Sequence, residues 1–159
     1  MHNVLFCGVG GQGVLTAAEI CGIAAMEAGF HVKKSEVHGM AQRGGSVESH
    51  LRFGDQVFSP LISPGSADLL VCFDQGEGER LAAFLAPAGT TFIPHLQAFR
   101  ESGEDRRFLN TYLLGVLSTY LPIDQNHWLG SLELVFKRAQ VENRRVFLKG
   151  AEYQPEKQA

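Results

Sequence analysis

A cluster of four glycines near the amino terminus constrains the fold of this chain more than any other feature. The apolar run Val4-Leu5-Phe6-Cys7 leads into the glycine loop, Gly8-Val9-Gly10-Gly11-Gln12-Gly13, and a helical pattern begins directly after it. A strand, a glycine loop and a helix in this order open an α/β unit of the nucleotide-binding kind. The glycines suit such a loop because they tolerate positive φ and allow a ligand or a second backbone to come close.

This glycine loop has two interpretations. The first turn of the following helix presents unpaired N–H groups and a partial positive charge, which can hold an anion. On this interpretation, the cofactor-binding residues are Gly8, Gly10, Gly11, Gln12 and Gly13. The alternative is a turn that only packs the helix against the strand, and the sequence leaves both open.

Apolar runs and helical patterns alternate along the chain, which predicts a three-layer, Rossmann-like α/β fold. The sheet is expected to be mixed and mostly parallel, with helices on both faces. Strands are predicted at 4–7, 30–33, 69–73 and 90–93, and helices at 14–28, 79–85, 108–120 and 128–139. Pro87-Ala88-Gly89 is predicted to form a turn, and residues 95–107 an exposed loop.

An antiparallel hairpin is predicted to be inserted into this sheet at residues 46–62. Residues 46–53 alternate in polarity, Gly54-Asp55 resembles a tight turn, and residues 56–62 return as a second strand. Pro60 favours an edge position or a bulge for that second strand. His50 and Arg52 share the polar face of the first strand and are candidates for a surface that contacts a ligand or a partner. A solvated strand face is the alternative.

The segment from Ser35 to Gly45 concentrates residues that can bind or react. It follows neither a helical nor a strand period, and its mixture of glycines and polar residues is typical of a shaped loop with a functional role. We predict that its residues contact a substrate or form an interface: Glu36, His38, Gly39, Met40, Gln42, Arg43, Gly44 and Gly45. The alternative is a connection whose polar groups satisfy each other.

Charge, hydropathy and cysteine content argue against several classes of function. The net charge is −3 and the basic residues are scattered, so no nucleic-acid surface is expected. No apolar run reaches about 18 residues, so no membrane span is expected. The few residues before Val4 leave no room for a signal peptide, which predicts a cytoplasmic location. The three cysteines are far apart in apolar segments, as core thiols are.

The chain shows no catalytic residues of its own. It contains no nucleophile elbow, no P-loop lysine, no metal-ligand cluster and no close pair of carboxylates. NAD-binding folds carry Asp or Glu at the end of the strand after the first helix, whereas this chain has Lys33-Lys34 there. This difference argues against NAD as a cofactor.

Two motifs together resemble a known family. The glycine loop and the segment Glu36-Val37-His38-Gly39-Met40-Ala41-Gln42-Arg43-Gly44-Gly45 are similar to the gamma-type domain of the 2-oxoacid:ferredoxin oxidoreductases. Further matches are Val47, His50-Leu51-Arg52, Ser59-Pro60-Leu61-Ile62, Ala67-Asp68, Asn110 and Asn143. The resemblance extends from about Asn3 to Gly150 and is strongest to the indolepyruvate-oxidising branch. The chain departs from the family pattern at Asp74 to Arg80, where glycines replace a more helical segment.

The resemblance implies one gamma-type domain over residues 1–151, followed by a polar tail at 152–159. Family members oxidatively decarboxylate a 2-oxoacid, form an acyl-CoA and reduce ferredoxin. Thiamine diphosphate, Mg²⁺ and iron–sulfur clusters are expected in a large partner subunit, which leaves this chain cluster-free. Coenzyme A is the candidate ligand at the interface, and self-association of the isolated chain is a further candidate interaction. The alternative function is a stand-alone module that binds a nucleotide or phosphate at the glycine loop.

Overall fold

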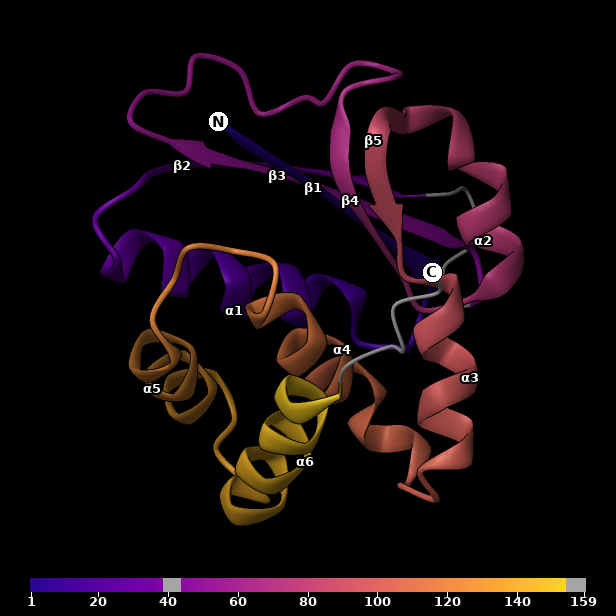
Figure 1. The fold of residues 1–159 in the computed structure, drawn as a ribbon, viewed down its shortest axis with the longest axis vertical. Coiled ribbons are helices and arrows are strands. Elements are labelled where there is room, and N and C mark those ends of the chain that lie inside the picture. The colour runs from indigo at the N-terminus through magenta and orange to yellow at the C-terminus, as the bar shows by residue number, and fades with distance from the viewer. Residues whose placement is uncertain (39–43, 154–159) are drawn as a thin grey trace.

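The fold is built on a five-stranded mixed sheet with helices on both faces. A computed structural model describes residues 1–38 and 44–153, and the strand order is β2-β3-β1-β4-β5 (Figure 1). The strands are β1 (His2–Val9), β2 (His31–His38), β3 (Ser46–Gly54), β4 (Ala67–Cys72) and β5 (Leu85–Thr91). β1 runs parallel to β4 and β4 to β5, while β3 is antiparallel to both β1 and β2. The expected α/β fold class is confirmed.

The two faces of the sheet are covered by different elements. Helix α1 (Val14–Glu27) packs on β1, β2 and β3, and its Gly22 lies against the Leu51 side chain. Side chains alternate along a strand, so Glu48 and His50 of β3 point to the opposite face. That face carries helix α2 (Gln75–Arg80) and the short 3₁₀ turn η1 (Ala82–Phe84). Figure 1 shows α1 directly against the sheet, with α5 and α6 beyond it.

The local sequence explains the first unit well. The residues of β1 from Val4 to Cys7 are fully buried, as expected for a central strand. Helix α1 begins after Gly13 and ends near Gly29, whose φ of +95° is favourable only for glycine among common residues. Its buried face consists largely of small residues, which allows the helix to lie close to the sheet.

The predicted hairpin is correct in one strand and wrong in its partner. Residues 56–62 form no strand, and β3 instead pairs with β2 on one side and β1 on the other. The segment from Asp55 to Ser66 lies over the sheet and is held there by side chains of β2 and β3. Val57 N–H donates to His31 Nδ1 at 3.0 Å, and Ile62 N–H donates to His50 Nδ1 at 3.1 Å. Pro60 therefore sits in an irregular segment, where its missing N–H costs nothing.

β2 is also longer and differently placed than predicted. It continues from His31 to His38 and lies at the edge of the sheet, separated from β1 by β3. Lys33 and Lys34 therefore lie in the middle of an edge strand, not at the end of a strand beside β1. NAD-binding folds carry their acidic residue at the end of the strand beside the first strand. In this fold the strand beside β1 is β3, so Lys33 and Lys34 of β2 do not occupy the equivalent position.

Three further boundaries differ from the sequence prediction. Helix α2 begins at Gln75, four residues before the predicted start, because Asp74 Oδ2 caps it by accepting a hydrogen bond from Glu77 N–H at 3.0 Å. β5 includes the predicted turn at residues 87–89, which an edge strand permits. Residues 93–101 form helix α3 (Ile93–Glu101) instead of a loop, since Leu96 and Phe99 are buried and Pro94 lies in its first turn.

Three helices complete the fold after the 3₁₀ turn η2 (Arg106–Phe108). They are α4 (Leu109–Ser118), α5 (Gln125–Val135) and α6 (Gln140–Glu152). Trp128 of α5 is fully buried and belongs to the hydrophobic core. Residues 154–159 lie outside the described part of the chain, so the domain boundary at residue 151 stays a prediction.

Helices α4 and α6 cross at two glycines, which generates a prediction. A Cβ atom on Gly115 would fall well inside van der Waals distance of the Phe147 carbonyl oxygen, and one on Gly150 would collide with the Tyr112 carbonyl. We expect Gly115→Ala to lower the free energy of unfolding by about 3 kcal/mol, because rigid backbone must move to admit the methyl group.

Gly130 of α5 provides the matched control, since no atom lies within 4 Å of its added Cβ. Gly130→Ala should leave stability unchanged or raise it by up to about 1 kcal/mol through helix propensity. Urea denaturation of both variants measures the difference. Equal stability of the two variants would contradict the close helix crossing.

Candidate functional site

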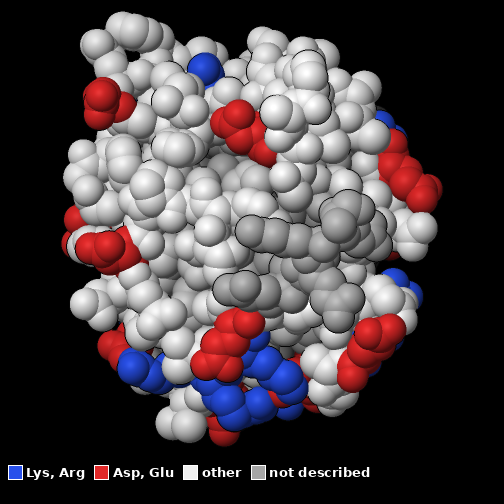
Figure 2. Space-filling model, in the orientation of Figure 1, with Lys and Arg blue, Asp and Glu red and all other residues white. Residues whose placement is uncertain are grey.

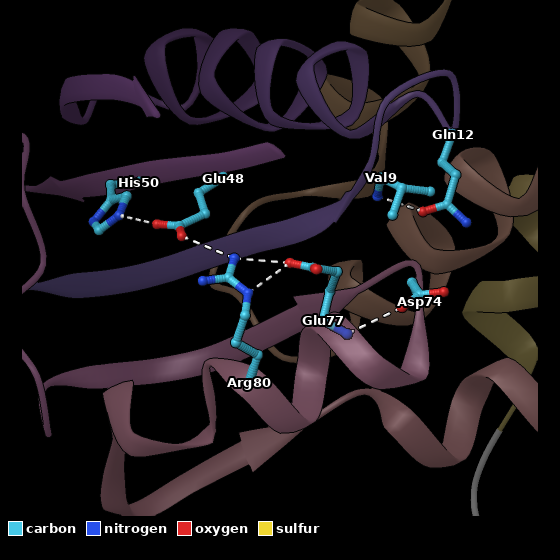
Figure 3. A network of polar contacts seen from close by, with 7 residues as sticks. All are labelled: Val9, Gln12, Glu48, His50, Asp74, Glu77 and Arg80. Carbon is cyan, nitrogen blue, oxygen red and sulfur yellow. Dashed lines mark hydrogen bonds and ion pairs between the residues drawn. The ribbon is translucent and has the colours of Figure 1, made fainter. Parts of the chain in front are cut away.

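The glycine loop is fastened on both sides by hydrogen bonds. Val9 N–H donates to Gln12 Oε1 at 2.8 Å (Figure 3). Gln12 Nε2 in turn donates to the Phe73 carbonyl at 3.2 Å. Gly10 N–H donates to the Gly45 carbonyl at 2.9 Å. The side chain of Gln12 therefore joins the ends of β1 and β4, while Gly10 joins the loop to the residues that precede β3.

Two of the glycines are required by close approach. A Cβ atom on Gly8 would lie 2.7 Å from Gln12 Oε1 and 2.9 Å from Phe73 Cβ. Gly13 has a φ of +84°, and a Cβ there would lie 2.6 Å from Asn110 Nδ2. Gly11 also has a positive φ, +93°, but among the described residues none has an atom within 4 Å of its added Cβ. The loop is thus packed tightly at Gly8 and Gly13 and open at Gly11.

A cleft of about 870 Å³ opens beside the glycine loop. One wall is formed by residues 11–13, which lead directly into α1, and another by residues between Leu96 and Asn110. Its lining includes Gly11, Gln12, Gly13, Phe73, Asp74, Gln75, Leu96, Phe99, Arg100, Asp105, Arg106, Arg107, Leu109 and Asn110. The size suits a drug-sized or nucleotide-sized ligand.

The charges at this cleft favour an anion. Arg100, Arg106 and Arg107 line the wall opposite the start of α1, which carries the partial positive charge of a helix dipole. Both acidic residues in the lining are already engaged. Asp74 caps α2, and Asp105 pairs with Arg107 at 3.3 Å.

Asn110 adds a donor to the cleft. Its side chain is 7% exposed, and its Oδ1 accepts the Thr111 N–H at 2.9 Å. Its Nδ2 group, which lies against Gly13, donates no hydrogen bond to any residue in the described ranges. A nearly buried amide with an unused donor at a helix start is suited to an oxygen acceptor.

The second predicted loop meets the glycine loop at its carboxyl end. Gly45 accepts the Gly10 N–H, and Gly44 has a φ of +73°. At the other end, Glu36 forms an ion pair with Lys34 at 3.4 Å, and His38 is the last residue of β2. Gly39, Met40, Gln42 and Arg43 lie outside the described residues. The two loops predicted from sequence are therefore adjacent in the fold.

His50 and Arg52 lie away from the cleft and have internal partners. His50 is 4% exposed, and its Nε2 contacts Glu48 Oε2 at 3.3 Å. Since its Nδ1 accepts the Ile62 N–H, Nε2 carries the proton that is donated to Glu48. Arg52 Nε donates to Asn3 Oδ1 at 2.9 Å, and its Nη1 donates to the Ser59 carbonyl at 2.8 Å. Their role toward a ligand or partner stays a prediction.

The contact from His50 extends into a polar network on the α2 side of the sheet. Arg80 lies between Glu48, at 3.1 Å, and Glu77, at 2.7 Å, and Figure 3 shows the chain His50–Glu48–Arg80–Glu77. The hydrogen bonds that the Arg80 guanidinium donates to Glu77, and then the one that it donates to Glu48, raise its pKa. The network joins α2 to β3.

The arginines of the cleft were not predicted from the sequence as site residues. Arg100, Arg106 and Arg107 belong to a stretch predicted as an exposed loop without a role. The buried positions Leu96 and Phe99, spaced three apart, were the available helical signal.

The cysteines behave as predicted. Cys7, Cys21 and Cys72 are free and buried. Burial raises the pKa of the Cys72 thiol to about 11 and raises those of Cys7 and Cys21 further. Thiols with such pKa values are poor nucleophiles at neutral pH.

Within residues 1–38 and 44–153, no three His, Cys, Asp or Glu side chains are grouped to hold a metal ion. In the same ranges, no helix is both long and apolar enough to cross a membrane.

An ion-pair cluster fixes the arginine-bearing wall of the cleft. Arg145 of α6 contacts both carboxylate oxygens of Glu104, at 2.6 and 3.0 Å, and Lys149 contacts one at 3.1 Å. In Figure 2, Lys and Arg gather with acidic residues at the lower end of the molecule, where Figure 1 places α6. Hydrogen bonds from Arg145, followed by the one from Lys149, lower the pKa of Glu104 from 4.5 to about 2.

This lowered pKa predicts a pH-dependent contribution to stability. A carboxylate with a depressed pKa stabilises the folded state above its unfolded-state pKa. The contribution should be complete above pH 4.5 and be lost as the pH falls toward 2. We therefore expect Glu104→Gln to be less stable than the parent at pH 7 and equally stable near pH 2. A stability difference that does not change between these pH values would contradict the ion-pair assignment.

Comparison with known proteins supplies the family. The model for pyruvate ferredoxin/flavodoxin oxidoreductases matches residues 3–98. Indolepyruvate oxidoreductase subunit IorB of Pyrococcus horikoshii is 45% identical over 91 residues, which is 57% of this chain and 45% of that protein. The subunit of the same name from Archaeoglobus fulgidus is 53% identical over 83 residues, or 52% of this chain and 41% of that protein. The match to these relatives spans less than half of their length.

Solved structures share the fold. The gamma subunit of a keto/oxoacid ferredoxin oxidoreductase from Geobacter sulfurreducens superposes with a TM-score of 0.72 at 23% identity, over 94% of this chain and 96% of that one. A 2-oxoglutarate:ferredoxin oxidoreductase from Magnetococcus marinus gives a TM-score of 0.76 at 18% identity, over 94% of this chain and 30% of that one. Since the family model covers more than half of the sequence and includes both loops, this chain belongs to the pyruvate ferredoxin/flavodoxin oxidoreductase family.

Proposed function

We propose that this chain is the small, cluster-free subunit of a 2-oxoacid:ferredoxin oxidoreductase that acts on indolepyruvate or a similar arylpyruvate. The observation that carries this proposal is the 44–53% identity to four archaeal proteins named indolepyruvate oxidoreductase subunit IorB. Weaker relatives bear the names of pyruvate synthase and phenylglyoxylate dehydrogenase subunits, at 34% identity. The indolepyruvate branch therefore has the better support.

In the proposed complex, the chemistry belongs to a large partner subunit. That subunit would hold thiamine diphosphate, Mg²⁺ and the iron–sulfur clusters, decarboxylate the 2-oxoacid and pass electrons to ferredoxin. The present chain would contribute a binding surface and no catalytic residue. We expect the complex to work in the cytoplasm. The stand-alone nucleotide-binding module has no support among the relatives.

Coenzyme A is the ligand that we propose for the cleft. Its phosphates would meet the start of α1 and the arginines of the opposite wall, and an acceptor oxygen would use the free Nδ2 group of Asn110. The chemistry of this donor set supports the proposal, because guanidinium groups and helix N-termini both favour phosphate oxygens. The adjacent loop at residues 36–45 would close the same surface against the large subunit.

Assembly with the large subunit provides the first test. We expect the chain, when produced with a large subunit of the indolepyruvate oxidoreductase type, to co-purify as a complex that oxidises arylpyruvates. Arg43→Ala should weaken assembly or turnover while the isolated chain keeps its fold, since Arg suits bidentate contacts with carboxylates. Lys137→Ala, an exposed cation elsewhere, is the control. Unfolding of the isolated Arg43→Ala chain would assign this arginine a structural role instead.

Ligand binding provides the second test. We expect calorimetry to detect coenzyme A binding to the complex, and Arg106→Ala to weaken it by about ten-fold, the loss of one charge-assisted contact of roughly 1.5 kcal/mol. Arg106 is exposed, so its removal should leave the fold intact. Unchanged affinity in Arg106→Ala and in Arg100→Ala would exclude the arginine wall as the phosphate site.

A further inference from the structure

The outer side of β2 is an open edge of the sheet. β2 is the terminal strand in the order β2-β3-β1-β4-β5, and no described strand pairs with its second side (Figure 1). An edge strand offers a row of free N–H and C=O groups, which another strand can use. Edge strands of natural proteins usually carry charged side chains, which prevent pairing with most other strands. The pattern of charges on β2 therefore decides which strand can pair with it.

Those charges are arranged to complement a second copy of the same strand. Lys34 and Glu36 lie on one face of β2, two residues apart, and contact each other at 3.4 Å. Two copies related by a two-fold axis pair antiparallel, and the residues that face one another then lie on the same face of the sheet. The residue through which the two-fold axis passes faces the same residue of the second chain.

Only the pairing register centred on Ser35 places opposite charges face to face; the registers centred on Lys34 or Glu36 do not. With Ser35 on the axis, Lys34 of each copy faces Glu36 of the other, which gives four alternating charges around the axis. With Lys34 on the axis, two lysines face each other, and with Glu36 on the axis, two glutamates do. Like charges directly opposite destabilise a pair of strands. The charge pattern therefore selects the register centred on Ser35.

The other face of β2 supports the same register. Val37 is 44% exposed there, and Lys33, on the same face, donates from Nζ to the Phe58 carbonyl at 3.4 Å. Phe58 is itself 80% exposed. In the register centred on Ser35, Val37 of one copy faces Lys33 of the other, close to Phe58. Pairing would thus cover Val37, an apolar side chain that the single chain leaves in water.

We propose that two copies of this chain associate through antiparallel pairing of their β2 strands, centred on Ser35, so that the two sheets become continuous. This proposal is independent of the enzymatic function. It commits to a second copy as the occupant of the edge, because the strand's charges complement themselves.

A charge exchange tests the pairing. We expect the full chain to sediment as a dimer in low salt and to dissociate more readily at about 1 M salt, where the Debye length falls to about 3 Å. Lys34→Glu and Glu36→Lys should each weaken the dimer by about ten-fold or more, because each places like charges opposite one another. An equimolar mixture of the two variants should recover it, since one strand then carries two glutamates and the other two lysines. Lys137→Glu is the control for a change in net charge.

A cysteine on the axis tests the register. Ser35→Cys should form a disulfide between two chains under mild oxidation, and the three native cysteines are buried and should not compete. Ser63→Cys, at an exposed position outside the strand, is the matched control. A chain that stays monomeric, a mixture that does not recover the dimer, or crosslinking that is equal at both positions would overturn the proposal. A monomer whose β2 gains protection from hydrogen exchange only with the large subunit would assign the edge to that subunit.

Discussion

The hydrogen bond from Gly10 to the Gly45 carbonyl is the contact on which the candidate site depends. It joins the loop after β1 to the residues that lead into β3, two segments about 35 positions apart in the sequence. The Gln12 side chain fixes the other side of the loop, between Val9 and Phe73. Because both braces use the backbone of the loop, the glycines are held in one conformation. The start of α1 and residues 44–45 are thereby brought to one end of the sheet.

The antiparallel strand β3 explains why a nucleotide-type opening leads to a different kind of site. In a dinucleotide fold, the second strand lies beside the first and its end reaches the ribose. Here β3 occupies that place, and β2 is displaced to the edge. The neighbour of the glycine loop is therefore Gly45 and the loop before β3.

Sequence reasoning reached the parts of the fold that depend on local pattern. The strand at Val4–Cys7 and the helix that follows the glycine loop are both found where the sequence pattern predicts them. The strands that pair with β3 could not be predicted from the sequence. The alternation of polar and apolar residues in β3 is the same whether it pairs with residues 56–62 or with β1. Helix α3 was missed because its polar residues hid two buried positions, Leu96 and Phe99. The arginines that follow were consequently left out of the candidate site, and Asn110 entered only through family resemblance.

The two loops are claimed to act as one surface toward coenzyme A and the large subunit, and hydrogen exchange tests that claim most directly. The backbone amides of residues 10–14 and 44–46 would be followed in the isolated chain, in the complex and in the complex with coenzyme A. The account predicts that exchange slows at both segments on assembly, and slows further at residues 10–14 when coenzyme A binds. Unchanged exchange at residues 10–14 in all three states, with protection confined to other elements, would contradict it.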